Sequence, residues 1–131
     1  MKKLILLATV SLLCVGVVST FAADAPKRGK LVHVVAFKFK KAITEAKKKE
    51  IADGLVALKT KIPQVISIEH GTNVSKEGFD KGFTHAFVVT FANEKDRDIY
   101  LEHPEHKKFA KLLDGILADK GVFVFDFVSK E

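Results

Sequence analysis

Three stretches rich in valine and phenylalanine constrain the fold of this chain more than any other feature, because each is apolar at both odd and even positions. The stretches are residues 31–39, 83–91 and 122–128. A strand with one solvated face alternates apolar and polar residues, whereas a strand covered on both faces reads as a nearly continuous apolar run. A sheet built from these strands is therefore expected to be covered on both sides.

A helical segment and a shorter strand follow the first stretch. Residues 44–62 place apolar side chains at helical spacing, and Thr44 is of a residue type that caps helix N-termini. Pro63 ends this segment, and a strand is expected at 65–69 before a polar loop at 71–82. The first half of the chain therefore predicts strand, helix and strand.

The second helical segment, residues 93–117, contains a proline. Asn93 is placed to cap its start, and apolar side chains recur at helical spacing to its end. Pro104 disfavours the helical conformation at His103, the residue before it, so a break in the helix is expected there. The last strand then follows at 122–128.

The order of the elements predicts an α+β fold. Strand, helix, strand, strand, helix and strand form a ferredoxin-like βαββαβ protomer, in which a four-stranded antiparallel sheet carries both helices on one face. The other face would be a large exposed apolar patch, which soluble monomers avoid. Two protomers are therefore expected to pack their sheets together as a homodimer with a shared, barrel-like core.

The N-terminal residues have the layout of a secretory signal peptide. A pair of lysines precedes an uncharged apolar run at 4–18, and small residues follow it around Ala22. The run is shorter than the roughly 20 residues of a membrane-spanning helix, although an uncleaved anchor is the alternative. We expect a signal peptide at 1–22, a flexible lead-in at 23–30, and export to the periplasm or the extracellular space without stable membrane insertion.

Composition excludes several classes of function. The formal net charge of the chain is +6, but the lysines scatter along helix faces, which is typical of a solvated surface. The chain has one tyrosine and no tryptophan, so it lacks the aromatic residues among basic ones that would favour nucleic-acid binding. The single cysteine, Cys14, lies in the predicted signal peptide, so no disulfide is expected. His103 and His106 are three residues apart, but Pro104 separates them and no cysteine or spaced carboxylate completes a zinc set. We expect no metal and no cofactor.

The candidate catalytic residues gather at the helix break. Tyr100 and His106 flank Pro104, and histidine is the side chain best suited to proton transfer near neutral pH. The hypothesis is that His106 removes a proton α to a carbonyl, that Tyr100 hydrogen-bonds the developing enolate, and that Asp126 orients His106. The alternative is that these side chains are hydrogen-bonded parts of the core that stabilise the fold.

A ligand pocket is expected beneath the helices. His33 and His85 share strand faces with apolar neighbours, and if those faces meet the helices both imidazoles lie near the helix break. The residues expected to contact a small apolar or carbonyl ligand are His33, Val35, Phe37, Ile51, Leu55, His85, Phe87 and His103.

Five segments resemble the stress-responsive dimeric α/β-barrel (Dabb) family, and the resemblance runs over about residues 31–128. They are His33-Val-Val-Ala-Phe37-Lys-Phe39-Lys, Ile62-Pro63, Gly82-Phe83-Thr84-His85, Asp98-Ile-Tyr100-Leu-Glu-His103-Pro104-Glu-His106 and Phe125-Asp126-Phe127. The resemblance implies a domain at 31–130 with a ferredoxin-like protomer that dimerises through its sheet. Many members of the family have no known activity.

One branch of that family implies a chemistry. A plant cyclase in it folds a linear, tetraketide-derived thioester by an intramolecular aldol step, and its acid–base tyrosine and histidine fall on Tyr100 and His106. Histidines on its first and third strands match His33 and His85. That enzyme lines its tunnel with aromatic residues from the first helix, where this chain has Ile51, Ala52 and Leu55. The loop before the last strand is also about two residues longer here, so the resemblance does not carry over a substrate.

Three functions remain open on this basis. The first is an exported, non-enzymatic homodimer that holds a small apolar ligand between helices and sheet, or acts as a stable stress-associated protein. The second is a cofactor-independent cyclase or lyase that uses His106 and Tyr100. The third is a cofactor-free monooxygenase, because enzymes of that kind share the dimeric ferredoxin-like form.

Overall fold

The computed structural model describes residues 29–130 of the chain. The expected signal peptide at 1–22 and most of the expected lead-in lie outside the described residues. Eight elements follow one another along the chain: β1 (Leu31–Phe39), α1 (Glu45–Val56), α2 (Leu58–Lys61), β2 (Ser67–Thr72), β3 (His85–Phe91), α3 (Glu94–Glu102), α4 (Pro104–Lys111) and β4 (Leu117–Val128).

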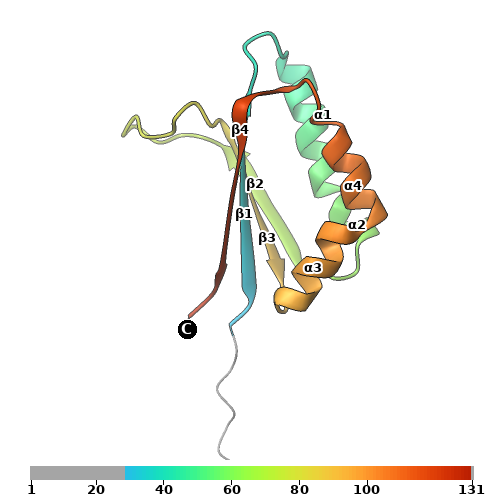
Figure 1. Cartoon of the computed structure of the whole chain (residues 1–131). Helices are drawn as coiled ribbons and strands as arrows, with labels where there is room; N and C mark the ends of the chain where they lie inside the picture. Colours follow the sequence, from blue (N-terminus) through green and yellow to red (C-terminus); the bar gives the residue numbers. More distant parts are fainter. Residues whose placement is uncertain (1–28, 131) are drawn as a thin grey trace, which may run out of the picture.

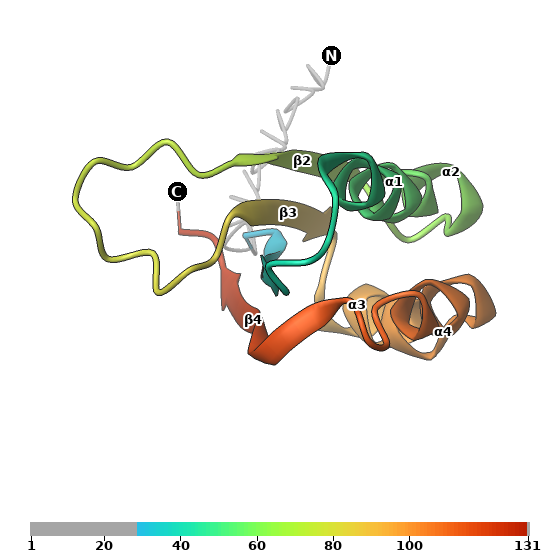
Figure 2. The ribbon, with the colours of Figure 1, turned by 90° about the horizontal axis from the view of Figure 1, so that it is seen from above.

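The strands form one antiparallel sheet in the order β2-β3-β1-β4. All helices cover the same face of this sheet, with α1 and α2 over its β2 side and α3 and α4 over its β4 side (Figures 1 and 2). The prediction of an α+β, ferredoxin-like protomer is therefore confirmed. Within the described part of the chain, no helix is long and apolar enough to cross a membrane.

Side-chain caps begin the helices where the sequence predicts them. Thr44 Oγ1 accepts a hydrogen bond from the Lys47 backbone N–H at 3.2 Å, and Asn93 Oδ1 accepts one from the Asp96 N–H at 2.9 Å. The first helical segment is split at Ala57, whose backbone stays in the right-handed helical region, so α2 continues the course of α1.

The proline break is confirmed and has a defined geometry. His103 has φ −64° and ψ 135°, an extended conformation that ends α3 and precedes α4. Pro104 occupies the first turn of α4, where its missing N–H leaves no helical hydrogen bond unmade. The His103 Nδ1 atom accepts the Glu105 backbone N–H at 3.2 Å and so caps the new helix.

The predicted end of the second helix is wrong. The apolar spacing favours a helix to residue 117, but α4 ends at Lys111, turns occupy 112–116, and Leu117 pairs with Phe39 at the start of β4. Gly115 has φ +74°, a left-handed conformation that ends helical geometry and that glycine adopts without steric cost. The expected strands at 65–69 and 83–91 are likewise displaced by two or three residues at one or both ends.

The core lies between the helices and the sheet. Along β1, the buried residues alternate, and they are Leu31, His33, Val35 and Phe37. Their partners on the same face of β3 are Phe87, Val89 and Phe91, and all three are buried. The opposite face of the sheet has no cover within the described chain: Phe123, Phe125 and Phe127 of β4 are 48%, 56% and 43% exposed there. We call this surface the open face.

Candidate functional site

A cavity of about 490 Å³ lies between the helix layer and the β1–β4 side of the sheet. Its apolar wall comes from β1, β4, α1 and the segment after α3, and includes Val35, Phe37, Leu55, Phe109, Leu113, Leu117, Val122 and Val124. Its polar side chains are His33, Tyr100, His106, Asp114 and Asp126. The cavity thus combines a mostly apolar surface with a few polar groups, the usual make-up of a small-molecule site.

Tyr100 and His106 meet across the helix break. Their ring centroids are 4.4 Å apart, and Tyr100 is buried against Phe91 as well. Burial raises the pKa of Tyr100 to about 12, so the hydroxyl stays protonated at neutral pH and is able to donate a hydrogen bond.

The helix break also fixes the tautomer of His106. Its Nδ1 atom lies 3.1 Å from the Leu101 carbonyl oxygen, which only accepts, so Nδ1 carries the hydrogen. The pKa of His106 is lowered, chiefly because burial disfavours the charged ring. In the neutral ring, Nε2 therefore holds a free lone pair, the form in which an imidazole acts as a base.

His33 is held by a chain of charged groups on the other side of the cavity. Its Nδ1 atom lies 2.5 Å from Asp126 Oδ1, and the second oxygen of that carboxylate accepts a hydrogen bond from Arg97 of α3. The His33 ring stands 6.1 Å from the Tyr100 ring, between their centroids. Nε2 of His33 makes no hydrogen bond to the described residues. Because every fully buried side-chain nitrogen in the described chain has a partner, Nε2 is not fully buried. Nε2 of His33 therefore opens to the cavity.

This arrangement corrects one predicted role. Asp126 was expected to orient His106, but it bonds His33 and Arg97, while His106 is oriented by the Leu101 carbonyl. The cause is the β1–β4 register, which places His33 directly opposite Asp126.

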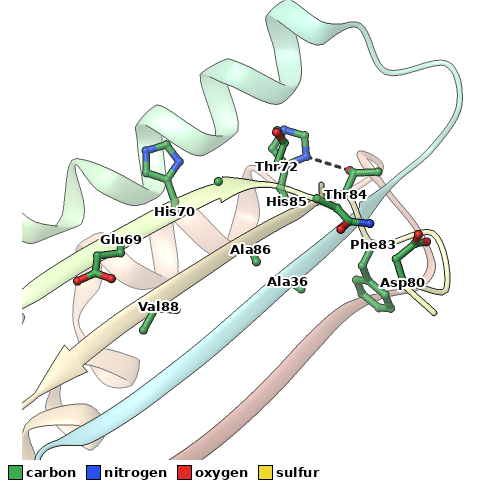
Figure 3. Close-up of a pocket in the computed structure, with 12 residues that line it drawn as sticks. Ala36, Glu69, His70, Thr72, Asp80, Phe83, Thr84, His85, Ala86 and Val88 are labelled. Carbon is green, nitrogen blue, oxygen red and sulfur yellow. Dashed lines mark hydrogen bonds between the residues drawn. The ribbon is translucent and has the colours of Figure 1, made fainter. Parts of the chain in front are cut away.

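Four residues expected to contact a ligand lie outside this cavity. Ile51 and Phe87 are fully buried parts of the core. His103 is engaged in capping α4, as described above. His85 sits at the far end of the sheet, where Nδ1 lies 2.9 Å from Thr84 Oγ1 and the ring packs edge-on against Phe39. It stands there beside His70 on the side that faces α1 (Figure 3).

Seven of the residues named from the sequence line the cavity: His33, Val35, Phe37, Leu55, Tyr100, His106 and Asp126. Sequence reasoning missed Phe109, Leu113, Leu117, Val122 and Val124 of the wall. Val122 and Val124 could have been found from the sequence, because they occupy alternate positions with Asp126 along one strand and so share its face. Arg97 carries no comparable signal, because an arginine in a polar helix turn reads as solvent-exposed.

Residues 31–129 match the model of the family described as the Stress Responsive A/B Barrel Domain. The chain belongs to this family. The resemblance inferred from the five segments is thereby confirmed.

Relatives of the A/B barrel domain agree with this assignment. The chain is 29% identical to an olivetolic acid cyclase of Cannabis sativa over 99 residues, which cover 76% of this chain and 96% of the cyclase. The structure of At3g17210 from Arabidopsis thaliana is similar, with a TM-score of 0.72 and 30% identity, over 77% of this chain and 96% of that one. A dimeric ferredoxin-like protein of unknown function from Jannaschia sp. shares the fold, with a TM-score of 0.69 and 23% identity over 77% and 100% of the two chains.

Within residues 29–130 of this A/B barrel domain, no group of three or more histidine, cysteine, aspartate or glutamate side chains is placed to hold a metal ion. The titratable side chains that line the cavity are two imidazoles, one phenol and two carboxylates.

The burial of His106 predicts a loss of stability in mild acid. The pKa of His106 and of His85 is lowered in the folded domain, in both cases chiefly by burial, so the unfolded chain takes up protons that the folded chain resists. Their contribution is complete above about pH 6.5, the ordinary histidine pKa, and declines as the pH falls towards the folded values. Urea unfolding between pH 7.5 and pH 5.5 measures this decline.

The variant His106→Asn is the matched control for this measurement. The asparagine amide is able to donate to the Leu101 carbonyl as Nδ1 does, but it does not titrate. We expect the variant to lose less stability over this pH range than the wild type. An equal loss in both proteins would show that His106 is not a titrating group there.

Proposed function

We propose that this chain acts as an exported homodimer that holds a small, apolar carbonyl compound in the cavity between helices and sheet. The observation that carries the proposal is that Tyr100, a neutral phenol, and His106, whose Nε2 carries no hydrogen, both line one largely apolar cavity. An apolar wall favours a hydrocarbon body, and the phenol hydroxyl suits a carbonyl oxygen.

The dimer part of the proposal rests on the open face. Three phenylalanine side chains of β4 are half-exposed there, and a surface of this kind usually marks an interface. A dimeric ferredoxin-like protein that shares the fold supports the same assembly. Export rests on the signal-peptide pattern of residues 1–22 alone.

A cofactor-independent cyclase or lyase is the second candidate, favoured by the placement of the two imidazoles. His106 Nε2 is the base that would take a proton α to the ligand carbonyl, and Tyr100 would donate to the enolate oxygen that develops. His33, across the cavity, would contribute a second nitrogen that faces the ligand. A relative of this chain is named olivetolic acid cyclase, which is consistent with this chemistry.

A thermal-shift and turnover experiment tests both readings. Medium-chain aldehydes, ketones and polyketide-like thioesters are screened against the wild type, His106→Asn and Tyr100→Phe, with His70→Asn as a histidine control outside the cavity. A compound present at about 100 times its Kd stabilises the folded state by about 2.7 kcal/mol, which raises Tm by several degrees. We expect this shift in the wild type and in His70→Asn, and a smaller one in Tyr100→Phe.

Compounds that bind are then assayed for product by mass spectrometry. A working base at His106 predicts a loss of about 10² to 10⁴ in kcat for His106→Asn. Binding without turnover would support the first reading over the second. Equal Tm shifts in all four proteins would place the ligand outside this cavity and contradict the proposal.

A further inference from the structure

The loop between β2 and β3, residues 73–84, extends away from the body of the protomer. It leaves the end of the sheet and projects to the side opposite the helices, as two perpendicular views show (Figures 1 and 2). That is the side of the open face. We call residues 73–84 the arm.

The arm is built by its own hydrogen bonds. Its two ends are joined by a hydrogen bond from the Asn73 N–H to the Thr84 carbonyl at 2.8 Å. Side-chain oxygens form two turns within it: Asn73 Oδ1 accepts the Ser75 N–H at 2.8 Å, and Asp80 Oδ1 accepts the Gly82 N–H at 2.6 Å. These bonds are local and shape the arm, whose base is attached to the sheet by a hydrogen bond from the Thr84 N–H to the Phe37 carbonyl at 3.0 Å.

Two apolar side chains of the arm, Val74 and Phe79, are nevertheless unpacked in the protomer. Val74 is 86% exposed and Phe79 is 75% exposed, the largest values among the exposed large apolar side chains of the described chain. A loop that was only a connection would need neither residue, since polar turn residues already define its course. The geometry points to a surface that these two side chains contact outside their own protomer.

The base of the arm is continuous with the open face. Phe83 packs edge-on against Phe123 of β4, with 6.3 Å between the ring centroids. A hollow of about 470 Å³ lies at this junction, and Phe83, Ala36 and Val88 contribute apolar surface to it (Figure 3). The arm and the open face therefore form one concave surface.

We propose that the arm clasps a second copy of this chain, with Phe79 and Val74 buried against the side of the partner protomer. This inference rests on the homodimer of the proposed function. Packed sheets lie about 10 Å apart, so a partner seated on the open face lies alongside any loop that stands out on that side. The charged residues of the arm are Lys76, Glu77, Asp80 and Lys81, which balance. A nucleic acid or an anionic membrane would favour a net positive charge instead.

Photo-crosslinking tests the contact directly. A benzophenone analogue of phenylalanine replaces Phe79 in the full chain, purified from the compartment in which it accumulates. Irradiation is expected to yield a covalent dimer of this chain. The same analogue in place of Leu112, an exposed residue in the turn after α4, is the control and is expected to yield none.

Sedimentation equilibrium of Phe79→Ser and Val74→Ser gives the second readout. Both side chains are exposed in the protomer, so circular dichroism is expected to be unchanged, while the dimer Kd rises about tenfold or more for Phe79→Ser. A wild type that is monomeric at all concentrations would overturn the homodimer and the arm together. A stable dimer with no crosslink at Phe79 and an unchanged Kd would overturn the arm alone, as would a crosslink to a different protein.

Discussion

Replacing Phe125 by aspartate is expected to convert the proposed dimer into a folded monomer. Phe125 is 56% exposed on the open face, between Phe123 and Phe127 along the edge strand β4. In the proposed dimer a carboxylate at this position would be buried without a partner, which is strongly unfavourable. We expect the Kd to rise at least about 100-fold, or roughly 2.7 kcal/mol. Light scattering at micromolar concentration measures the change.

Val128→Asp is the control for Phe125→Asp. Val128 lies on the same strand and is 47% exposed, but its side chain belongs to the other face of the sheet. We expect this variant to remain dimeric. If Phe125→Asp also remained dimeric, the open face would not be the dimer interface.

Asp126→Ala is expected to lower the free energy of unfolding by about 2 to 3 kcal/mol. The change leaves His33 Nδ1, in a buried ring, without its acceptor, and it removes the carboxylate that accepts from Arg97. Breaking a buried charged pair by removing one member is costly, and Asp126 is partly exposed, so we expect a value below the range for full burial. Urea unfolding at pH 7.5 measures the difference.

The variant Asp126→Asn separates charge from hydrogen bonding. Its amide oxygen still accepts from His33 Nδ1, so we expect it to retain about half of the lost stability. A loss below about 0.5 kcal/mol for Asp126→Ala would show that the contact between His33 and Asp126 does not stabilise the fold.

Local rules were sufficient to predict most of the fold. The alternation of burial along β1, the caps at Thr44 and Asn93, and the break before Pro104 all depend on residues within a few positions of one another. The end of α4 was not predictable in this way. The spacing of the apolar residues after Phe109 suits a helix, and pairing of Leu117 with a distant strand decides the outcome.

The candidate site divides along the same line. Tyr100 and His106 are only six positions apart, so their proximity was predictable from the sequence. The residues of β1 that face the helices were predictable from the alternation of side chains along a strand. The partner of Asp126 was not predictable in this way, because His33 is 93 residues away in the sequence and only the register between β1 and β4 brings the two side chains together. His85 was placed on the correct face of its strand, but at a position along the strand that is too far from the cavity.

The break at Pro104 has a consequence for the reorganisation energy of any reaction in the cavity. In an uninterrupted helix the Leu101 carbonyl would accept the N–H of Glu105, but here that N–H donates to His103. The carbonyl is left to His106, whose ring is thereby locked before any ligand arrives. A base whose ring needs neither rotation nor tautomer exchange adds no reorganisation energy to the activation barrier. Pro104 therefore determines the orientation and the tautomer of the His106 ring, as well as the course of the chain.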